Sequence, residues 1–190
     1  MRPSCAFCRE WPGELAWAAS AVWLEDGPAR NLAHALKYGG WRSAAPAMAE
    51  RIAAAAPARL RSLGALVPVP LGRTRERERG HNQAALLAEA LGRLGGVPVL
   101  HGALLRTRET RSQTRLPPAE RWRNVLGAFA VAGGGGRGGH GAPRLDGLEV
   151  ALVDDVLTTG ATLGAAAVAL AALGPATIGA LTFARAVVPS

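Results

Sequence analysis

The sequence predicts an α/β domain with a mainly parallel, doubly wound sheet and flanking helices. Short apolar segments alternate along the chain with longer segments whose apolar residues recur at helical spacing, which is typical of strand–helix–strand units. The chain has 190 residues, enough for one domain with a sizeable core. Hydrophobic residues make up 49 % of the chain, and this excludes a disordered protein.

The expected elements follow from local patterns, taken in chain order. In the first half we expect a strand at 17–24, a helix at 29–38 begun by Pro28, a helix at 44–63 capped by Ser43, a strand at 65–69 and an Arg/Glu-rich loop at 72–80. In the second half we expect a helix at 82–94, a brief strand at 97–100, a short helix at 117–125, strands at 128–131 and 148–153, a helix at 163–173 and a strand at 178–184.

Two segments stand apart from this pattern. Residues 1–15 contain Pro3, Pro12 and Gly13 and are expected to form an irregular N-terminal segment, and residues 16–190 form the domain. Within the domain, residues 132–147 are dominated by glycine and are expected to be a flexible insertion, because they contain little that builds a core.

The charge is strongly basic. The net charge is +8, and Lys37 is the only lysine among the 22 basic residues. The guanidinium group of arginine suits phosphate oxygens, so a polyanionic partner is indicated, either a pyrophosphate-bearing metabolite or nucleic acid. A solvated surface explains the same composition. No apolar run is long enough to span a membrane, and the first residues lack the apolar core of a signal peptide, so a cytoplasmic protein is expected.

Cys5 and Cys8 are the only cysteines. Their C-x-x-C spacing supplies two ligands, whereas a structural zinc ion needs four. A disulfide is disfavoured in a reducing cytosol. The pair is therefore either half of a site shared between molecules or a remnant, and we expect no zinc in this chain.

The chemistry is concentrated in residues 149–162. An apolar strand runs into Asp154 and Asp155, and a turn rich in threonine and glycine leads to a helix that begins near Ala161. Ligands of parallel sheets bind beyond the carboxyl ends of the strands, and a helix N-terminus there offers amide groups to a phosphate. Gly160 allows close backbone approach, and the carboxylates can accept hydrogen bonds from two ribose hydroxyls. Helix capping is the simpler alternative for such a turn.

This segment resembles the signature of type I phosphoribosyltransferases that binds phosphoribosyl pyrophosphate (PRPP). The resemblance implies that Asp154 and Asp155 contact the ribose hydroxyls and act in catalysis. It further implies that the following residues form the PRPP-binding loop: Val156, Leu157, Thr158, Thr159, Gly160, Ala161 and Thr162. Mg²⁺ would then be held mainly by oxygens of PRPP itself.

Four blocks of the chain, taken together, resemble the ComF family of competence-associated proteins. They are L-K-Y-G-G at 36–40, V-P-V-P-L at 67–71 with R-E-R-G-H-N-Q at 77–83, a third stretch within 106–129, and the PRPP signature. His81 stands where the family usually has phenylalanine. ComF proteins commonly begin with a cysteine-rich zinc module, and Cys5 and Cys8 look like its remnant.

The resemblance assigns roles to basic residues outside the PRPP loop. Lys37, Arg75 and Arg79 are expected to bind the pyrophosphate, with Arg79, beside Gly80, as the best candidate. The segment that includes Arg106, Arg108 and Gln113 is expected to be a flexible loop that closes over the ligand, although an ordinary solvated loop would have the same composition.

Three functions are compatible with these features. The first is Mg²⁺-dependent transfer of phosphoribose to an unidentified acceptor with release of pyrophosphate. The second is a PRPP-gated protein that binds single-stranded DNA and works with the competence machinery in DNA uptake and natural transformation; Trp122, between two arginines, is its candidate stacking ring. The third is a PRPP sensor without catalysis. The acceptor and the oligomeric state, including a homodimer, are left open by the sequence.

Overall fold

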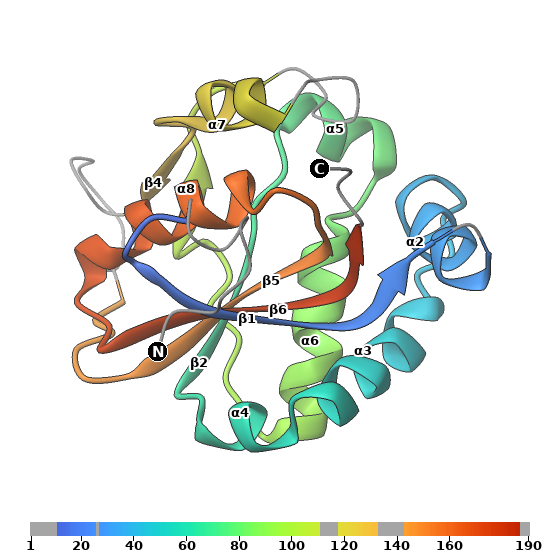
Figure 1. Cartoon of the computed structure of the whole chain (residues 1–190), viewed down its shortest axis with the longest axis horizontal. Helices are drawn as coiled ribbons and strands as arrows, with labels where there is room; N and C mark the ends of the chain where they lie inside the picture. The colour runs from blue at the N-terminus through green and yellow to red at the C-terminus, as the bar shows by residue number, and fades with distance from the viewer. Residues whose placement is uncertain (1–10, 26, 111–117, 133–142, 187–190) are drawn as a thin grey trace.

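A computed structural model describes residues 11–25, 27–110, 118–132 and 143–186. Its centre is a parallel four-stranded sheet in the order β1-β6-β5-β2 (Figure 1). These strands comprise β1 (Leu15–Leu24), β2 (Ala65–Pro68), β5 (Glu149–Leu157) and β6 (Thr177–Ala186). β5 lies between two parallel neighbours, β6 and β2, so its carboxyl end is flanked by other strands on both sides.

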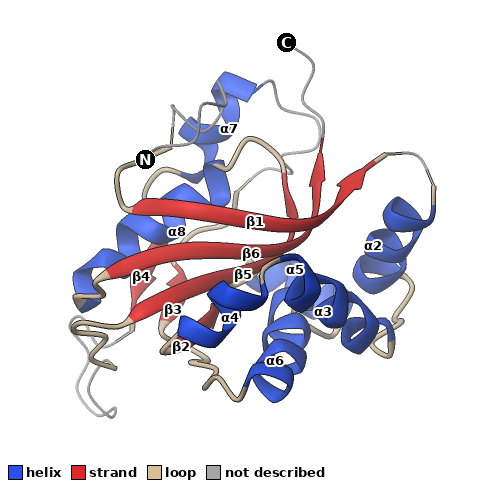
Figure 2. Cartoon of the chain, turned by 60° about the horizontal axis from the view of Figure 1, so that its bottom comes forward, coloured by secondary structure: helices blue, strands red, loops and turns tan. Residues whose placement is uncertain are grey.

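Helices cover both faces of the sheet (Figure 2). One face carries α2 (Pro28–Tyr38), α3 (Ala44–Ala55), α4 (Pro57–Ser62) and α6 (Gln83–Gly95). The other carries α8 (Ala161–Leu170), the 3-10 turn η2 (Ala171–Leu173), α7 (Pro118–Val125) and an antiparallel ribbon of β3 (Leu104–Arg106) and β4 (Phe129–Val131). The parallel sheet with flanking helices confirms the predicted fold class.

The alternation of side chains along β5 builds two separate cores. Val150 and Leu152 pack toward α8, in the same core as Leu163 and Leu170. Ala151 and Val153 point to the opposite face and join the core formed with α3 and α6. Because both faces are buried, the strand is apolar at each position from Val150 to Val153, as is typical of parallel sheets.

The predicted helix at 44–63 is wrong in one respect. The structure breaks it into α3 and α4 at Ala56, whose φ of −140° and ψ of 54° are not helical. Pro57 causes the break, because its ring disfavours the helical conformation of the preceding residue and it has no N–H to donate. Ser43 makes no side-chain capping hydrogen bond to α3, so its predicted role as a cap is also wrong.

The predicted loop at 72–80 is also wrong, because residues 73–79 form the helix α5 (Arg73–Arg79). The segment has no apolar stripe, yet arginine and glutamate are good helix formers and Gly80 ends the helix in the left-handed conformation at φ 68°. Helical geometry places Arg75 and Arg79 on one face of α5, where both are half-buried, whereas Arg73 and Arg77 are exposed.

Three further boundaries differ from the predictions. β5 extends beyond residue 153 to Leu157, so both aspartates lie within the strand. The strand at 128–131 pairs only with β3 and stands outside the main sheet. The candidate strand at 97–100 makes a single parallel bridge, from Val99 to Leu66. The glycine-rich insertion lies largely outside the described residues, and its predicted flexibility stays a prediction.

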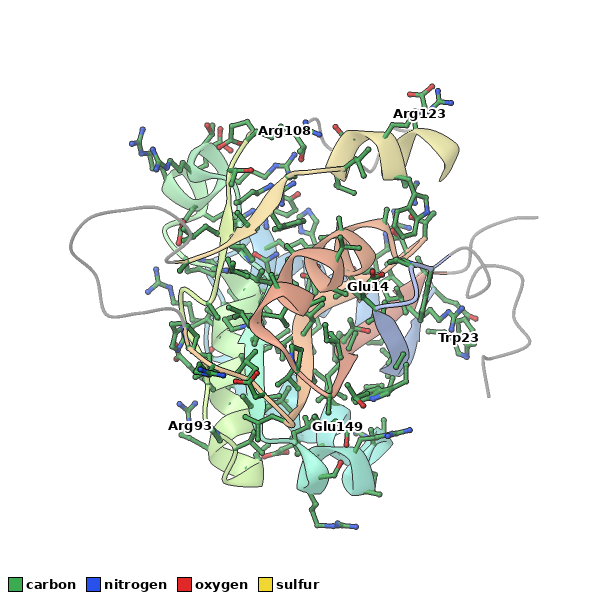
Figure 3. The ribbon with its side chains drawn as sticks, turned by 90° about the vertical axis from the view of Figure 1, so that its left-hand side faces the viewer. Glu14, Trp23, Arg93, Arg108, Arg123 and Glu149 are labelled. Carbon is green, nitrogen blue, oxygen red and sulfur yellow. The ribbon has the colours of Figure 1, made fainter. Side chains whose placement is uncertain are left out.

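The amino end of β5 is held by a polar network at the far end of the molecule from α5 and α7. Glu149 accepts hydrogen bonds from the Trp17 indole and the Arg59 guanidinium, each at 3.0 Å, and from the Ser62 hydroxyl at 2.8 Å. Arg108 and Arg123 project at the opposite end (Figure 3). Within the described ranges, no helix is long and apolar enough to cross a membrane.

Candidate functional site

The candidate site begins with two aspartates at the carboxyl end of β5. Asp155 is 3 % exposed, and its Oδ2 lies 2.7 Å from Nζ of Lys37, the last residue but one of α2. Asp154 is partly buried, and its Oδ1 accepts a hydrogen bond from the Asp155 amide at 2.8 Å. The predicted acid pair and the predicted lysine, 117 residues apart in the chain, therefore meet in one place.

The pKa values of this group follow from burial and charge. Burial, and after it the negative charge of Asp155, raises the pKa of Asp154 to about 7. Burial by itself lowers the pKa of Lys37, but the charge and hydrogen bond of Asp155 outweigh it, so the pKa of Lys37 is raised above its usual value. At neutral pH the site thus contains a charged lysine and a carboxyl group balanced between its two protonation states.

Arg79 is connected to the acid pair through Gln83. Its Nη1 donates to Gln83 Oε1 at 3.0 Å, and Gln83 Nε2 lies 3.5 Å from Asp155 Oδ1, at the limit for a hydrogen bond. Its Nη2 donates to the Tyr38 hydroxyl at 3.2 Å, and the guanidinium stacks 4.8 Å from the Tyr38 ring. Arg79 is therefore linked to Asp155 through Gln83 and lies within electrostatic reach of Lys37.

His81 ties α2 to α5. It is 9 % exposed, and its two ring nitrogens lie 2.7 Å from the Leu36 carbonyl and 2.9 Å from the Arg79 carbonyl. A phenylalanine in this position has no polar atom to offer these carbonyls. His81 thus links the two segments of the chain that carry Lys37 and Arg79.

The turn after the acids has the form expected for a phosphate cradle. Gly160 has φ 84°, a left-handed conformation that favours glycine, and it precedes α8 without any side-chain cap among the described residues. The Thr159 side chain is 4 % exposed, and its hydroxyl has no hydrogen-bond partner within the described parts of the chain. An unused donor beside uncapped helix amides is a combination that suits a bound anion.

A second basic group lies around the end of β3. Arg75 donates to the Thr110 carbonyl at 2.9 Å, and Arg106 bonds to the Thr110 hydroxyl and stacks 5.2 Å from the Phe129 ring. Burial, followed by the positive charge of Arg75, lowers the pKa of Arg106, while the charge of Asp154 opposes this shift. Arg75 and Arg106 therefore face one another within electrostatic reach of the acid pair.

Glu109 is a carboxylate within electrostatic reach of Arg106. Its Oε1 accepts a hydrogen bond from the Thr74 amide at 3.1 Å, and its Oε2 lies 2.3 Å from where a Cβ at Gly72 would stand. The carboxylate thus sits directly against the backbone at the start of α5. An anionic group therefore lies beside the start of the helix that carries Arg75 and Arg79.

Several predicted residues do not offer a side chain to this site. Arg108 donates to the Leu126 carbonyl at 2.8 Å. Leu157 and Ala161 are buried in the core, and Val156 packs against the core on the other face, so only their backbone can touch a ligand. Gln113, Cys5 and Cys8 lie outside the described residues. Within the described parts of the chain, no group of three or more His, Cys, Asp or Glu side chains could hold a metal ion.

Trp122, the predicted stacking ring, packs against α8. A Cβ at Gly164 would lie 2.5 Å from its Cη2, and the ring is partly buried against the core. Part of this ring is therefore covered by protein, which makes it a weaker candidate for stacking on nucleobases than an exposed ring. Exposed rings occur instead at Trp23, Tyr38 and Trp41, with exposed fractions of 59, 63 and 63 %.

The comparisons with known proteins agree with this geometry. Residues 86–187 match the Phosphoribosyl transferase domain. Competence protein F of Haemophilus influenzae is 37 % identical over 110 residues, and Competence protein ComFC of Bacillus subtilis is 37 % identical over 111 residues. The chain belongs to the ComF family of phosphoribosyltransferase-type proteins.

The ComF relatives are matched over part of their length. The two competence proteins align with 58 % of this chain, which covers 45 % and 40 % of their own sequences. DNA utilization protein YhgH of Salmonella typhimurium is 31 % identical over 156 residues, or 80 % of this chain and 64 % of that protein. The sequence resemblance to ComF proteins is thereby confirmed, and the match covers the β5–α8 turn.

Proposed function

We propose that this ComF protein binds PRPP with Mg²⁺ at the β5–α8 turn and transfers its phosphoribosyl group to an acceptor. One observation carries the proposal: a short turn joins the acid pair of β5 to a helix N-terminus without a side-chain cap, and the buried Thr159 hydroxyl in this turn has no partner within the described residues. A sugar phosphate matches this arrangement, because its phosphate accepts hydrogen bonds and its hydroxyls donate them.

The proposed pose uses both halves of the site. The 5′-phosphate accepts hydrogen bonds from the turn 158–162, and the ribose hydroxyls donate to Asp154 and Asp155. The pyrophosphate extends toward Lys37 of α2 and toward Arg75 and Arg79 of α5. Lys37 then exchanges its Asp155 partner for a phosphate oxygen, and Arg106 adds a further positive charge.

The proposed reaction breaks the bond between C1 of the ribose and the pyrophosphate oxygen, which leaves with the electron pair. A nitrogen or oxygen of the acceptor forms the new bond to C1 and loses its proton. The chain contributes by positioning and by stabilising charge, as is usual in glycosyl transfer without a covalent residue. Mg²⁺ would neutralise the departing pyrophosphate, and Asp154, whose ionisation burial and Asp155 disfavour, fits the vicinity of a cation.

The test combines binding and turnover. Calorimetry with PRPP and Mg²⁺ should give saturable binding to the wild-type protein and none to Asp154→Asn or Asp155→Asn. Asp146→Asn removes an exposed carboxylate elsewhere and should bind normally. Unchanged affinity in both site variants would overturn the proposal. Pyrophosphate release is then measured with a panel of nucleobases, and binding without release indicates the PRPP sensor.

A second candidate function is supported by the exposed rings. Tyr38 and Trp41 lie at the end of α2 and just beyond it, and Arg79 stacks on Tyr38, while Arg42 donates to the Gly80 carbonyl at 2.6 Å. Aromatic faces beside arginines suit the stacked bases of single-stranded nucleic acid. The relatives' names refer to competence and DNA utilization. The alternative function is therefore a PRPP-gated competence factor in the cytoplasm that binds single-stranded DNA.

This alternative has a separate test. The anisotropy of a labelled oligothymidine should rise with wild-type protein and fall steeply with added salt, since phosphate contacts release counterions. Tyr38→Ala and Trp41→Ala should weaken binding, while Trp122→Phe should not. Absent or salt-insensitive binding would reject single-stranded DNA as the partner.

A further inference from the structure

Trp11, in the segment before β1, lies directly on the proposed PRPP-binding turn. Its indole N–H donates to the Thr159 carbonyl at 3.2 Å, and its side chain is 7 % exposed. A Cβ at Gly160 would stand only 2.3 Å from Trp11 Nε1, so the indole rests on the glycine backbone itself. Trp11 thus contacts this turn although it lies 148 positions before Thr159 in the chain.

The hydrogen bond fixes the orientation of one peptide group. In a planar trans peptide the C=O and N–H point in opposite directions. Because Trp11 holds the carbonyl of Thr159, the N–H of Gly160 in the same peptide is directed away from the indole. Glycine at φ 84° has little steric barrier to a rotated peptide, so the turn depends on this contact to keep one orientation.

We infer that Trp11 is a positioning residue, which turns the Gly160 amide toward the phosphate of the bound sugar phosphate. The inference rests on the proposed function for the identity of the ligand. Trp11 lies outside the PRPP signature, in the predicted irregular N-terminal segment 1–15. Trp11 acts through the backbone of the turn and does not itself touch the phosphate.

The chain offers a matched control one helical turn away. Trp122 of α7 packs on Gly164 as Trp11 packs on Gly160, with its Cη2 2.5 Å from the position of a Cβ. The substitutions Trp11→Phe and Trp122→Phe each replace an indole with a smaller ring. The two indoles cover Gly160 and Gly164, which are four residues apart at the start of α8. Only the first substitution removes the hydrogen bond to the Thr159 carbonyl.

The experiment measures affinity for ribose 5-phosphate by calorimetry, with thermal stability recorded for each variant. Trp11→Phe should bind about threefold to tenfold more weakly than wild type, the worth of one hydrogen bond. Trp122→Phe should bind ribose 5-phosphate with wild-type affinity, even if its melting temperature falls as much as that of Trp11→Phe. Wild-type affinity in Trp11→Phe, or an equal loss in both variants, would overturn the positioning role.

A second readout does not depend on the ligand. In ¹⁵N-labelled protein without ligand, the Gly160 amide should give one sharp resonance in the wild type and in Trp122→Phe. In Trp11→Phe it should broaden or split, because the peptide samples two orientations; an unchanged resonance would count against the inference. If wild-type protein binds neither ribose 5-phosphate nor PRPP, the proposed function fails, while the amide signal still tests the orientation by Trp11.

Discussion

Lys37 Nζ and Asp155 Oδ2 lie 2.7 Å apart, which joins the C-terminal end of α2 to the carboxyl end of β5. The Asp155 side chain is 4 % exposed and that of Lys37 25 %. A carboxylate so deeply buried depends on its partner for stability. The pair therefore holds the site together before any ligand arrives, and it places the lysine where pyrophosphate is proposed to bind.

Removing the lysine should destabilise the protein. Lys37→Met leaves the Asp155 charge buried without a partner, and we expect the free energy of unfolding to fall by about 1–3 kcal/mol, less than for a fully buried pair because Lys37 is partly exposed. Chemical denaturation measures the change. The double variant Lys37→Met/Asp155→Asn should recover part of this lost stability. If the double-mutant cycle gives no coupling energy between the two substitutions, the ion pair does not stabilise the protein.

The pKa of Asp154 predicts how stability depends on pH. Its folded value of about 7 lies above the usual value of about 3.9, so the folded protein binds this proton more tightly than the unfolded chain. The resulting stabilisation is complete below about pH 4 and is lost as pH rises through about 7. Asp154→Asn removes the titration. The melting temperature of this variant relative to wild type should rise from pH 5 to pH 8, and a constant difference would contradict the prediction.

Two arginines of α5 should differ in their effect on pyrophosphate binding. Arg75 is half-buried and faces Thr110, whereas Arg77 is exposed. We expect Arg75→Ala to weaken the binding of inorganic pyrophosphate with Mg²⁺ by about tenfold or more, as for a hydrogen bond from a charged group. Arg77→Ala removes the same charge from the same helix and should have little effect. An equal loss of affinity in both variants would mean that net charge, and not the position of Arg75, determines pyrophosphate binding.

Glu109 should compete with anionic ligands for the start of α5. Its carboxylate accepts from the Thr74 amide and lies against Gly72, close to the arginines that are proposed to bind pyrophosphate. Glu109→Gln keeps the size of the side chain but removes its charge, so we expect tighter pyrophosphate binding, measured by calorimetry. Glu78→Gln, an exposed change on α5, is the control. Weaker binding in Glu109→Gln alone would mean that the carboxylate supports the ligand.

Gly179 of β6 is expected to tolerate no side chain. A Cβ there would lie 2.0 Å from Cε2 of Trp17, whose indole is held by Glu149. Gly179→Ala should therefore cost about 1–3 kcal/mol of stability through overpacking, seen as a lower melting temperature. A second substitution, Trp17→Leu, should restore part of the stability that Gly179→Ala loses. PRPP affinity should stay unchanged, because this contact is at the end of the sheet away from the acid pair.

Local patterns predicted most of the strands and helices, and they failed where tertiary contacts or single residues decide. Pro57 divided a helix that apolar periodicity made continuous. α5 was missed because a short helix that rests on polar contacts has no apolar stripe. The brief strand at 128–131 was found, but its pairing with β3 depends on a partner that local sequence does not specify.

The β5–α8 turn could be predicted from local sequence alone. Its chemistry is contiguous, since an apolar strand, two acids, a glycine and threonines lie within 14 residues and take their geometry from their neighbours. The four ComF blocks identified the family for the same reason. Thr159, Gly160 and the acid pair were therefore predictable without coordinates.

The residues that surround that turn became known only from the packed fold. Lys37 pairs with Asp155, His81 bridges Leu36 and Arg79, Glu109 lies at the start of α5, and Trp11 lies on Gly160. The physical reason is that these contacts join residues far apart in the chain. Burial and the directions of side chains select such partners, and both exist only once the sheet and its helices have packed.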